Sequence, residues 1–295
     1  MTINVRFQAP GDGHLTPEMK QAWQDHGVLL LEGFKSEREC DALTERARRI
    51  AREADLTNAG IFASRQPAAE RDEYFRSSGD TIKCFLEEEA IDEDGNLLAP
   101  QDEAINKIGH AMHDLDPVFE DFSHSARLAT LAREVGLKDA RVLQSMFIFK
   151  PPRIGGPVMW HQDGTYLYTE PQSVVGFWFA LDDASQENGC LWAIPGGHGE
   201  TLRTRFVRDG KGFATHTLDD SDFDMSRAIP LPANKGDMVI LHGRLPHASE
   251  YNRSDRSRHA YTLHVIDGEC DYPKDNWLQR QDDFPLKGFE KGLVS

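Results

Sequence analysis

Cysteine is scarce in this chain. Its 295 residues contain only four cysteines, at positions 40, 84, 190 and 270, and no two of them stand in a C-x-x-C pair. Zinc sites built from thiolates normally use such pairs, so the spacing argues against this class of metal site. We expect these cysteines to be reduced and structurally inert.

Long apolar runs and positive charge are also in short supply. No apolar stretch approaches the roughly 18 residues that a membrane-spanning helix needs. Residues 1–8 lack the pattern of a secretory signal, and the last residues show no targeting tripeptide. With 33 Lys and Arg against 49 Asp and Glu, the net charge of −16 repels nucleic acid and anionic membranes. We therefore expect a cytoplasmic protein whose partner is a small-molecule substrate, with no nucleic-acid or membrane partner; the oligomeric state stays open.

The first 139 residues are expected to be mostly helical. Apolar spacing predicts helices over residues 17–25, 104–113 and 119–135. An S-x-x-E capping box at Ser36 opens a further helix, and the apolar run over residues 27–33 predicts a short buried strand. Residues 59–103 are polar and are expected to be irregular, with a turn at residues 92–96.

From residue 140 the pattern changes to short apolar segments separated by Gly, Pro, Asn and Asp. They predict strands over residues 142–149, 158–162, 173–181, 189–194, 228–231, 237–242 and 259–266. Such a series is typical of a β-sandwich or barrel, and a jelly roll is one solution. We predict a mainly β protein with one domain over residues 1–295: a helical buttress at 1–139, a β-helix core at 140–268 and a C-terminal tail at 269–295.

A histidine and a carboxylate, His161 and Asp163, stand two positions apart at the end of one predicted strand. Side chains with this spacing on a strand point to the same face, and a jelly roll brings the distant His247 toward them. Two imidazoles and one carboxylate leave three positions of a metal open, as in non-haem Fe(II) oxygenases. Because the chain has 12 histidines, a His-x-Asp pattern also arises by chance, and the surrounding residues must support the interpretation.

Arg258 follows His247 at the start of a predicted strand. An oxygenase with a dicarboxylate co-substrate needs a fixed cation for the far carboxylate, and arginine binds carboxylates with two parallel hydrogen bonds. Arg253 and Arg256 lie close by in the sequence and are rival candidates. Arg258 is favoured because it stands among residues that alternate in polarity, whereas Arg253 fits a solvated turn.

These segments resemble the phytanoyl-CoA dioxygenase family of Fe(II)/2-oxoglutarate oxygenases, and most closely its subgroup of phytanoyl-CoA dioxygenase domain-containing proteins. The matching strings are H-Q-D-G-T-Y-L-Y-T-E-P at 161–171, E-N-G-C-L-W-A-I-P-G-G-H at 187–198 and the histidine–arginine segment at 247–261. Shorter matches stand at 106–111, 144–150 and 275–279. The resemblance covers most of the chain, and the combination is far more specific than any one string.

The resemblance implies a cupin-like double-stranded β-helix in which His161, Asp163 and His247 bind Fe(II). It also implies that Arg258 binds 2-oxoglutarate, the co-substrate that is consumed together with O2. In the subgroup, further residues line the co-substrate pocket, and their counterparts here are Lys107, Met146, Gln162, Trp178 and Ser249. Judged from the sequence alone, Met146 and Trp178 are core residues. Lys107 offers a second cation to a dianionic ligand, and this role is favoured over the alternative of an ordinary lysine on a helix surface.

Other polar residues have plainer interpretations. His110 and His113 are expected on one helix as packing or surface residues, while His198 and His242 are expected to have structural roles. The basic segment at residues 203–211 interrupts the strand pattern and fits either a lid over an anionic substrate or a solvated loop.

The expected activity is hydroxylation of an organic substrate, with release of succinate and carbon dioxide. Halogenases of this type carry a small residue in place of the carboxylate, so Asp163 disfavours halogenation. Two alternatives stay open: a non-catalytic jelly-roll binding module, and a metal oxygenase that does not use 2-oxoglutarate.

Overall fold

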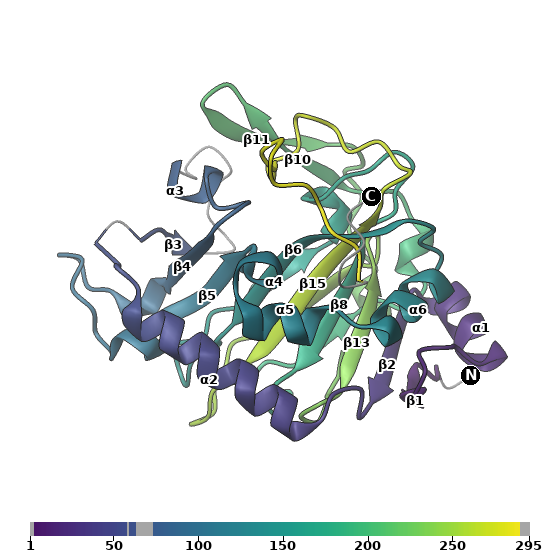
Figure 1. Ribbon diagram of the computed structural model, residues 1–295, viewed down its shortest axis with the longest axis horizontal. Coiled ribbons are helices and arrows are strands. Elements are labelled where there is room, and N and C mark those ends of the chain that lie inside the picture. Colours follow the sequence, from purple (N-terminus) through teal and green to yellow (C-terminus); the bar gives the residue numbers. More distant parts are fainter. Residues whose placement is uncertain (1–2, 58, 63–72, 290–295) are drawn as a thin grey trace.

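A nine-stranded mixed sheet forms the centre of the protein (Figure 1). The computed structural model describes residues 3–57, 59–62 and 73–289. The strand order is β1-β2-β13-β8-β15-β6-β5-β4-β3, with parallel pairs at the two edges and antiparallel pairs between them. The strands are β1 (Arg6–Gln8), β2 (Val28–Glu32), β3 (Ile61–Phe62), β4 (Ile82–Glu87), β5 (Ile105–His110), β6 (Ala140–Ile148), β8 (Val175–Ala180), β13 (Met238–His242) and β15 (Ala260–Asp267).

A four-stranded antiparallel sheet packs against the middle of the large one. Its order is β12-β9-β14-β7, and its strands are β7 (Val158–His161), β9 (Leu191–Ala193), β12 (Ile229–Leu231) and β14 (His247–Ser249). From β6 to β15 the chain passes back and forth between the two sheets, and Trp178, Leu191 and Val239 belong to one apolar core between them. This arrangement confirms the predicted jelly-roll, double-stranded β-helix core.

Helices cover the opposite face of the large sheet. They are α1 (Pro17–His26), α2 (Glu37–Glu53), α4 (Met112–Leu115), α5 (Pro117–Ser123) and α6 (Ala126–Glu134), while α3 (Glu73–Arg76) lies apart from them (Figure 1). The predicted capping box opens α2, because Ser36 Oγ accepts from the backbone N–H of Glu39 and the Glu39 carboxylate accepts from that of Ser36. Among the described residues, no helix is both long and apolar enough to cross a membrane.

Strand β8 shows why the central strands read as continuous apolar runs. Phe177 and Phe179 belong to the core beneath the helices, whereas Trp178 and Ala180 belong to the core between the two sheets. All six residues of β8 are buried, since each face of the strand is covered. The side chains on the inner face are the ones that can reach a site inside the jelly roll.

The helix predicted over residues 104–113 is wrong. Its first part is β5, which pairs with both β4 and β6, and only residues from Met112 onward form the short α4. Strand pairing on both sides outweighs the local apolar spacing. The helix predicted over residues 119–135 is two helices, because Ser125 begins α6 with a new N-cap. The segment at residues 59–103 was expected to be irregular, and its residues 63–72 lie outside the described part of the chain; the described part contains β3 and β4.

All seven strands predicted beyond residue 140 are present, with ends shifted by a few residues. The structure adds β14 and a hairpin of β10 (Thr204–Asp209) and β11 (Gly212–Thr217), which form a separate two-stranded sheet. The hairpin spans the basic segment that interrupts the apolar pattern. The predicted buttress supplies β1 to β5 as well as helices.

Asp114 of α4 forms ion pairs with residues of the segment that follows β15. Its carboxylate, which is fully buried, accepts from Arg280 at 2.8 Å, and it lies 3.1 Å from His113 Nε2 and 3.3 Å from Lys287 Nζ. Burial opposes ionisation of Asp114, but the hydrogen bond from His113 and the charge of Arg280 outweigh it and lower the pKa of this carboxyl. The contact matters for the site because Trp277, just before Arg280, lines the central cavity.

We expect Asp114→Asn to lower the free energy of unfolding by about 3–5 kcal/mol near neutral pH, because Arg280 is then left buried without its counter-charge. Asp255→Asn, which alters an exposed ion pair with Arg153, should change little. The lowered pKa of Asp114 stabilises the fold above pH 4 or so, and this contribution is lost as the pH falls further. Urea unfolding between pH 7 and 3 measures both effects; an equal cost for the two variants would contradict this assignment.

Candidate metal centre

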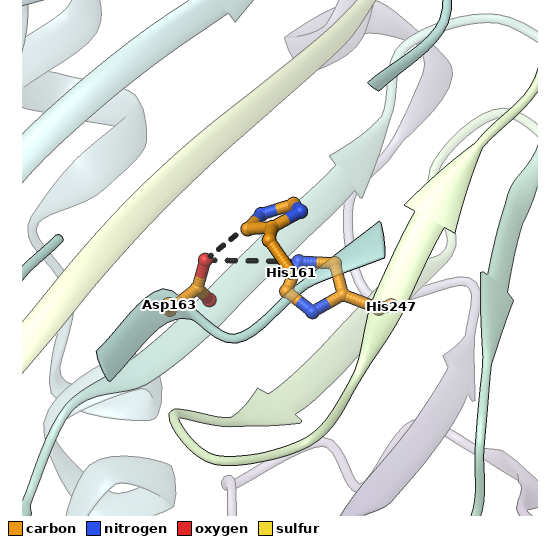
Figure 2. Close-up of side chains that lie close together, drawn as sticks. All are labelled: His161, Asp163 and His247. Atoms are coloured by element: carbon orange, nitrogen blue, oxygen red, sulfur yellow. Dashed lines mark ion pairs between the residues drawn. The ribbon is translucent and has the colours of Figure 1, made fainter. Parts of the chain in front are cut away.

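His161, Asp163 and His247 meet inside the jelly roll (Figure 2). His161 ends β7, Asp163 begins the short 3-10 turn Asp163–Thr165, and His247 begins β14. Because β7 and β14 pair with His247 opposite His161, the centres of the two imidazole rings lie 4.3 Å apart. Asp163 Oδ1 lies 3.5 Å from His161 Nε2 and 3.6 Å from His247 Nε2.

The ring orientation of both histidines is fixed by backbone carbonyls. His161 Nδ1 lies 2.8 Å from the carbonyl oxygen of Met159, and His247 Nδ1 lies 3.0 Å from that of Leu245. A carbonyl only accepts, so each Nδ1 carries the proton and each Nε2 keeps its lone pair. Burial and the neighbouring His161 lower the pKa of His247 to about 4, which keeps this imidazole neutral and able to bind a metal.

Asp163 is the third potential ligand, and its environment keeps it ionised. Burial favours the neutral carboxyl, but His264, whose Nε2 faces the carboxylate, outweighs it and holds the pKa of Asp163 well below the usual range. Its Oδ2 is buried without a hydrogen-bond partner among the described residues. The donor set of two neutral imidazoles and one carboxylate therefore fits a divalent metal with open positions.

His264 is a residue of this centre that the sequence interpretation missed. Its Nε2 lies 3.4 Å from Asp163 Oδ1, and it approaches from β15. The residue opposite is Gly176 of β8, where a Cβ atom would stand only 2.9 Å from Asp163 Oδ2. The sequence pattern could have placed His264 at the site, because Thr262 and His264 alternate with Leu263 and therefore share the inner face of β15.

The metal centre opens into a cavity of about 190 Å³ that Arg258 also lines. Arg258 is buried, and its Nε and Nη1 have no hydrogen-bond partner among the described residues. Its guanidinium carbon lies 5.5 Å from the centre of the Trp178 ring. Burial lowers the pKa of Arg258 to about 10, so the side chain stays charged at neutral pH. The rivals Arg253 and Arg256 are exposed.

Four of the five other predicted pocket residues line the same cavity: Lys107, Met146, Trp178 and Ser249. Lys107 lies on β5 instead of a helix surface and is buried. Its Nζ lies 3.4 Å from the centre of the Phe62 ring and 3.8 Å from Met146 Sδ. The alternative of a helix-surface lysine is therefore wrong.

Gln162 differs from the expectation, because it points away from the cavity. Its side-chain amide donates to the carbonyl of Arg244 at 2.7 Å and accepts from the backbone N–H of Arg203 at 2.9 Å. Since His161 and Asp163 face the cavity, the residue between them faces the other way. Gln162 thus ties the strand end to the segments that precede β10 and β14.

The basic segment at residues 203–211 does not direct its charges into the cavity. Arg203 pairs with Glu200 and Asp219, Arg205 pairs with Asp275, and Arg208 donates to the carbonyl of Trp277. The hairpin instead contributes apolar side chains, since Phe206 and Phe213 pack against Phe75. Neither a basic lid nor a solvated loop describes it.

The four other histidines singled out in the sequence are not among the grouped metal-ligand candidates, although His110 lines the cavity. His110 lies on β5 and His113 in α4, so they do not share one helix, and both are fully buried. His113 Nδ1 contacts Ser145 Oγ at 2.8 Å, and His110 Nδ1 contacts Ser78 Oγ at 2.9 Å. His198 and His242 pack against each other with ring centres 5.1 Å apart.

Known proteins share both the sequence and the fold. The family model described as Phytanoyl-CoA dioxygenase (PhyH) matches residues 23–260. "Phytanoyl-CoA dioxygenase domain-containing protein 1" of Bos taurus is 43% identical over 283 residues, which cover 92% of this chain and 97% of the relative. "Phytanoyl-CoA dioxygenase" of Arabidopsis thaliana is 40% identical over 269 residues, or 91% and 95% of the two chains.

Two solved structures show the same fold at low sequence identity. The non-heme alpha ketoglutarate dependent carbocyclase SnoK from nogalamycin biosynthesis has a TM-score of 0.61 and 19% identity, with 92% of this chain and 96% of that chain covered. EctD from S. alaskensis, solved with 2-oxoglutarate and 5-hydroxyectoine, has a TM-score of 0.60 and 18% identity, with 97% and 92% covered. Taken with the family model and the close relatives, these findings show that the chain belongs to the phytanoyl-CoA dioxygenase family.

Proposed function

We propose that this protein is an Fe(II)- and 2-oxoglutarate-dependent dioxygenase that hydroxylates a small organic substrate. The observation that carries the proposal is that His161, Asp163 and His247 share one cavity with the buried Arg258. Two imidazoles and a carboxylate are typical of Fe(II) oxygenases. Arg258 has two guanidinium nitrogens, Nε and Nη1, that lack a hydrogen-bond partner among the described residues, which favours an anionic ligand. A dicarboxylate that binds iron at one end can pair with this cation at the other.

In this proposal, His161 Nε2, His247 Nε2 and the Asp163 carboxylate hold the iron. When bound, Fe(II) supplies the oxygen chemistry that turns a substrate C–H bond into C–OH while 2-oxoglutarate becomes succinate and carbon dioxide. Arg258 binds the far carboxylate of 2-oxoglutarate, next to Trp178, and Ser249 lines the same cavity. Because the chain keeps Asp163, no ligand position is vacated for a halide, and hydroxylation is favoured over halogenation.

Apolar and aromatic side chains form part of the cavity wall. Phe75, Tyr166, Leu167 and Trp277 line it beside the metal residues, and apolar walls strengthen electrostatic contacts within them. Each histidine Nδ1–H donates to its backbone carbonyl, and this hydrogen bond keeps both rings in one orientation.

Anaerobic addition of Fe(II) and 2-oxoglutarate should produce a weak visible charge-transfer band, and oxygen should then yield succinate. Asp163→Ala should lose both signals while its circular dichroism spectrum stays native, whereas the exposed Asp222→Ala should keep both. A wild type with neither signal would favour a non-catalytic binding module. Oxidation that needs iron but not 2-oxoglutarate would favour a different metal oxygenase.

Arg258→Ala should raise the 2-oxoglutarate concentration for half-maximal succinate formation by about a hundredfold or more, because a buried charge-assisted pair is lost. Arg256→Ala is the matched control, since it removes the same charge from an exposed position two residues earlier. If Arg256→Ala had the larger effect, the wrong arginine would have been assigned.

His264→Ala should weaken Mn(II) binding by about 10- to 100-fold, because the Asp163 carboxylate loses the group that orients it. His264→Gln, which can still donate to a carboxylate, should recover part of the affinity, and the exposed His216→Ala should have none of this effect. Equilibrium dialysis against Mn(II) measures the change without turnover. An unaltered affinity in His264→Ala would show that His264 does not position the ligand.

A further inference from the structure

Lys150 is a second buried cation in the cavity, and the sequence interpretation gave it no role. It follows β6, its side chain lines the cavity, and only 2% of the residue is exposed. Its Nζ donates to the carbonyl of Gly156 at 2.8 Å and to Ser249 Oγ at 3.0 Å. Within the described residues no carboxylate lies within 4.0 Å of this ammonium group. Both of its acceptors are therefore uncharged.

The backbone holds Lys150 in this place. Its φ of +40° lies in the left-handed region, which is uncommon for a residue with a side chain. Asn252 Nδ2 donates to the Lys150 carbonyl at 2.9 Å and to the Arg256 carbonyl at 2.7 Å, which ties together the two loops. A strained backbone that its surroundings over-determine is common at ligand sites.

Arg258 lies beside Lys150, because its backbone N–H donates to the Lys150 carbonyl at 3.2 Å. Both side chains line the cavity, and Ser249 accepts from Lys150 within it. Burial and the like charge of Arg258 both lower the pKa of Lys150 well below its usual range. The two cations thus repel each other where water cannot screen them.

The nearby carboxylates do not neutralise this pair. Glu87 and Glu250 attract Lys150, and Asp182 attracts Arg258, but none of them is within ion-pair distance. Glu87 is buried and already accepts from Asn106 Nδ2 at 2.8 Å and from the N–H of Gly156 at 3.0 Å. Asp182 is hydrogen-bonded to His259, and Glu250 is exposed.

We propose that Lys150 and Arg258 together bind the far carboxylate of the dicarboxylate co-substrate, with Ser249 between them. This assignment rests on the proposed function and explains why the protein would select a 2-oxo acid with two carboxylates over one with a single carboxylate. A 2-oxo acid with a second carboxylate pairs both cations, whereas pyruvate leaves both of them buried and unpaired. The second cation is Lys150 and not Lys107, since Lys150 is the one that donates to Ser249.

The test compares binding of 2-oxoglutarate and of pyruvate to the Mn(II)-loaded protein by anaerobic titration calorimetry. Lys150→Met should weaken 2-oxoglutarate binding by about 10- to 100-fold and leave pyruvate binding within about twofold, because one charge-assisted contact to the far carboxylate is lost. Lys211→Met, which removes an exposed lysine outside the cavity, is the control and should leave the ratio of the two dissociation constants unchanged. Lys150→Gln keeps a donor without the charge and should behave like Lys150→Met.

Thermal unfolding without ligand separates lost binding from lost folding. Relief of the repulsion between the two cations should leave the melting temperature of Lys150→Gln at or above that of the wild type. The wild type could bind 2-oxoglutarate while Lys150→Met and Lys150→Gln leave the ratio of the two dissociation constants unchanged. That result would overturn the role of Lys150 alone. Failure of the Mn(II)-loaded wild type to bind 2-oxoglutarate would overturn the proposed function and this assignment together.

Discussion

The pairing of β14 with β7 is the constraint on which the rest of the site depends. In this register His247 lies opposite His161, and β14 also pairs on its other side with β9, where His247 lies opposite Ala193. A slip of one residue would turn His247 to the outer face of the sheet and separate the two imidazoles. Because both neighbours of β14 fix its register, the geometry at the centre of the cavity is a property of the jelly roll itself.

Charge in the cavity contrasts with charge on the protein as a whole. The chain has a net charge of −16, yet Arg258 and Lys150 are buried in the cavity without an ion-pair partner among the described residues. Buried charge of this kind is costly to folding and is retained where a ligand supplies the counter-charge. The same cavity holds the ionised Asp163 among three histidines, so it presents a metal-binding end and an anion-binding end to one ligand.

Residues whose chemistry restricts their type were easier to predict than residues whose role depends on packing. His161, Asp163, His247 and Arg258 were selected by their spacing and by the family resemblance, and the structure brings all four to one cavity. The strands could be found from their apolar runs. The element that carries Lys107 was misjudged because Ile105 and Ile108 also fit a helix, and only pairing with β4 and β6 decides the matter. Lys150 was missed because a lysine after a strand normally points to solvent.

The central claim is that one cavity binds a metal through His161, Asp163 and His247 and the far carboxylate of a dicarboxylate at its other end. Anaerobic crystals grown with Fe(II) and 2-oxoglutarate, measured at the iron absorption edge, test it most directly. The account predicts one anomalous peak bonded to Nε2 of both histidines and to Asp163, with the far carboxylate at Arg258. An iron bound elsewhere, or a 2-oxoglutarate that does not reach Arg258, would contradict it.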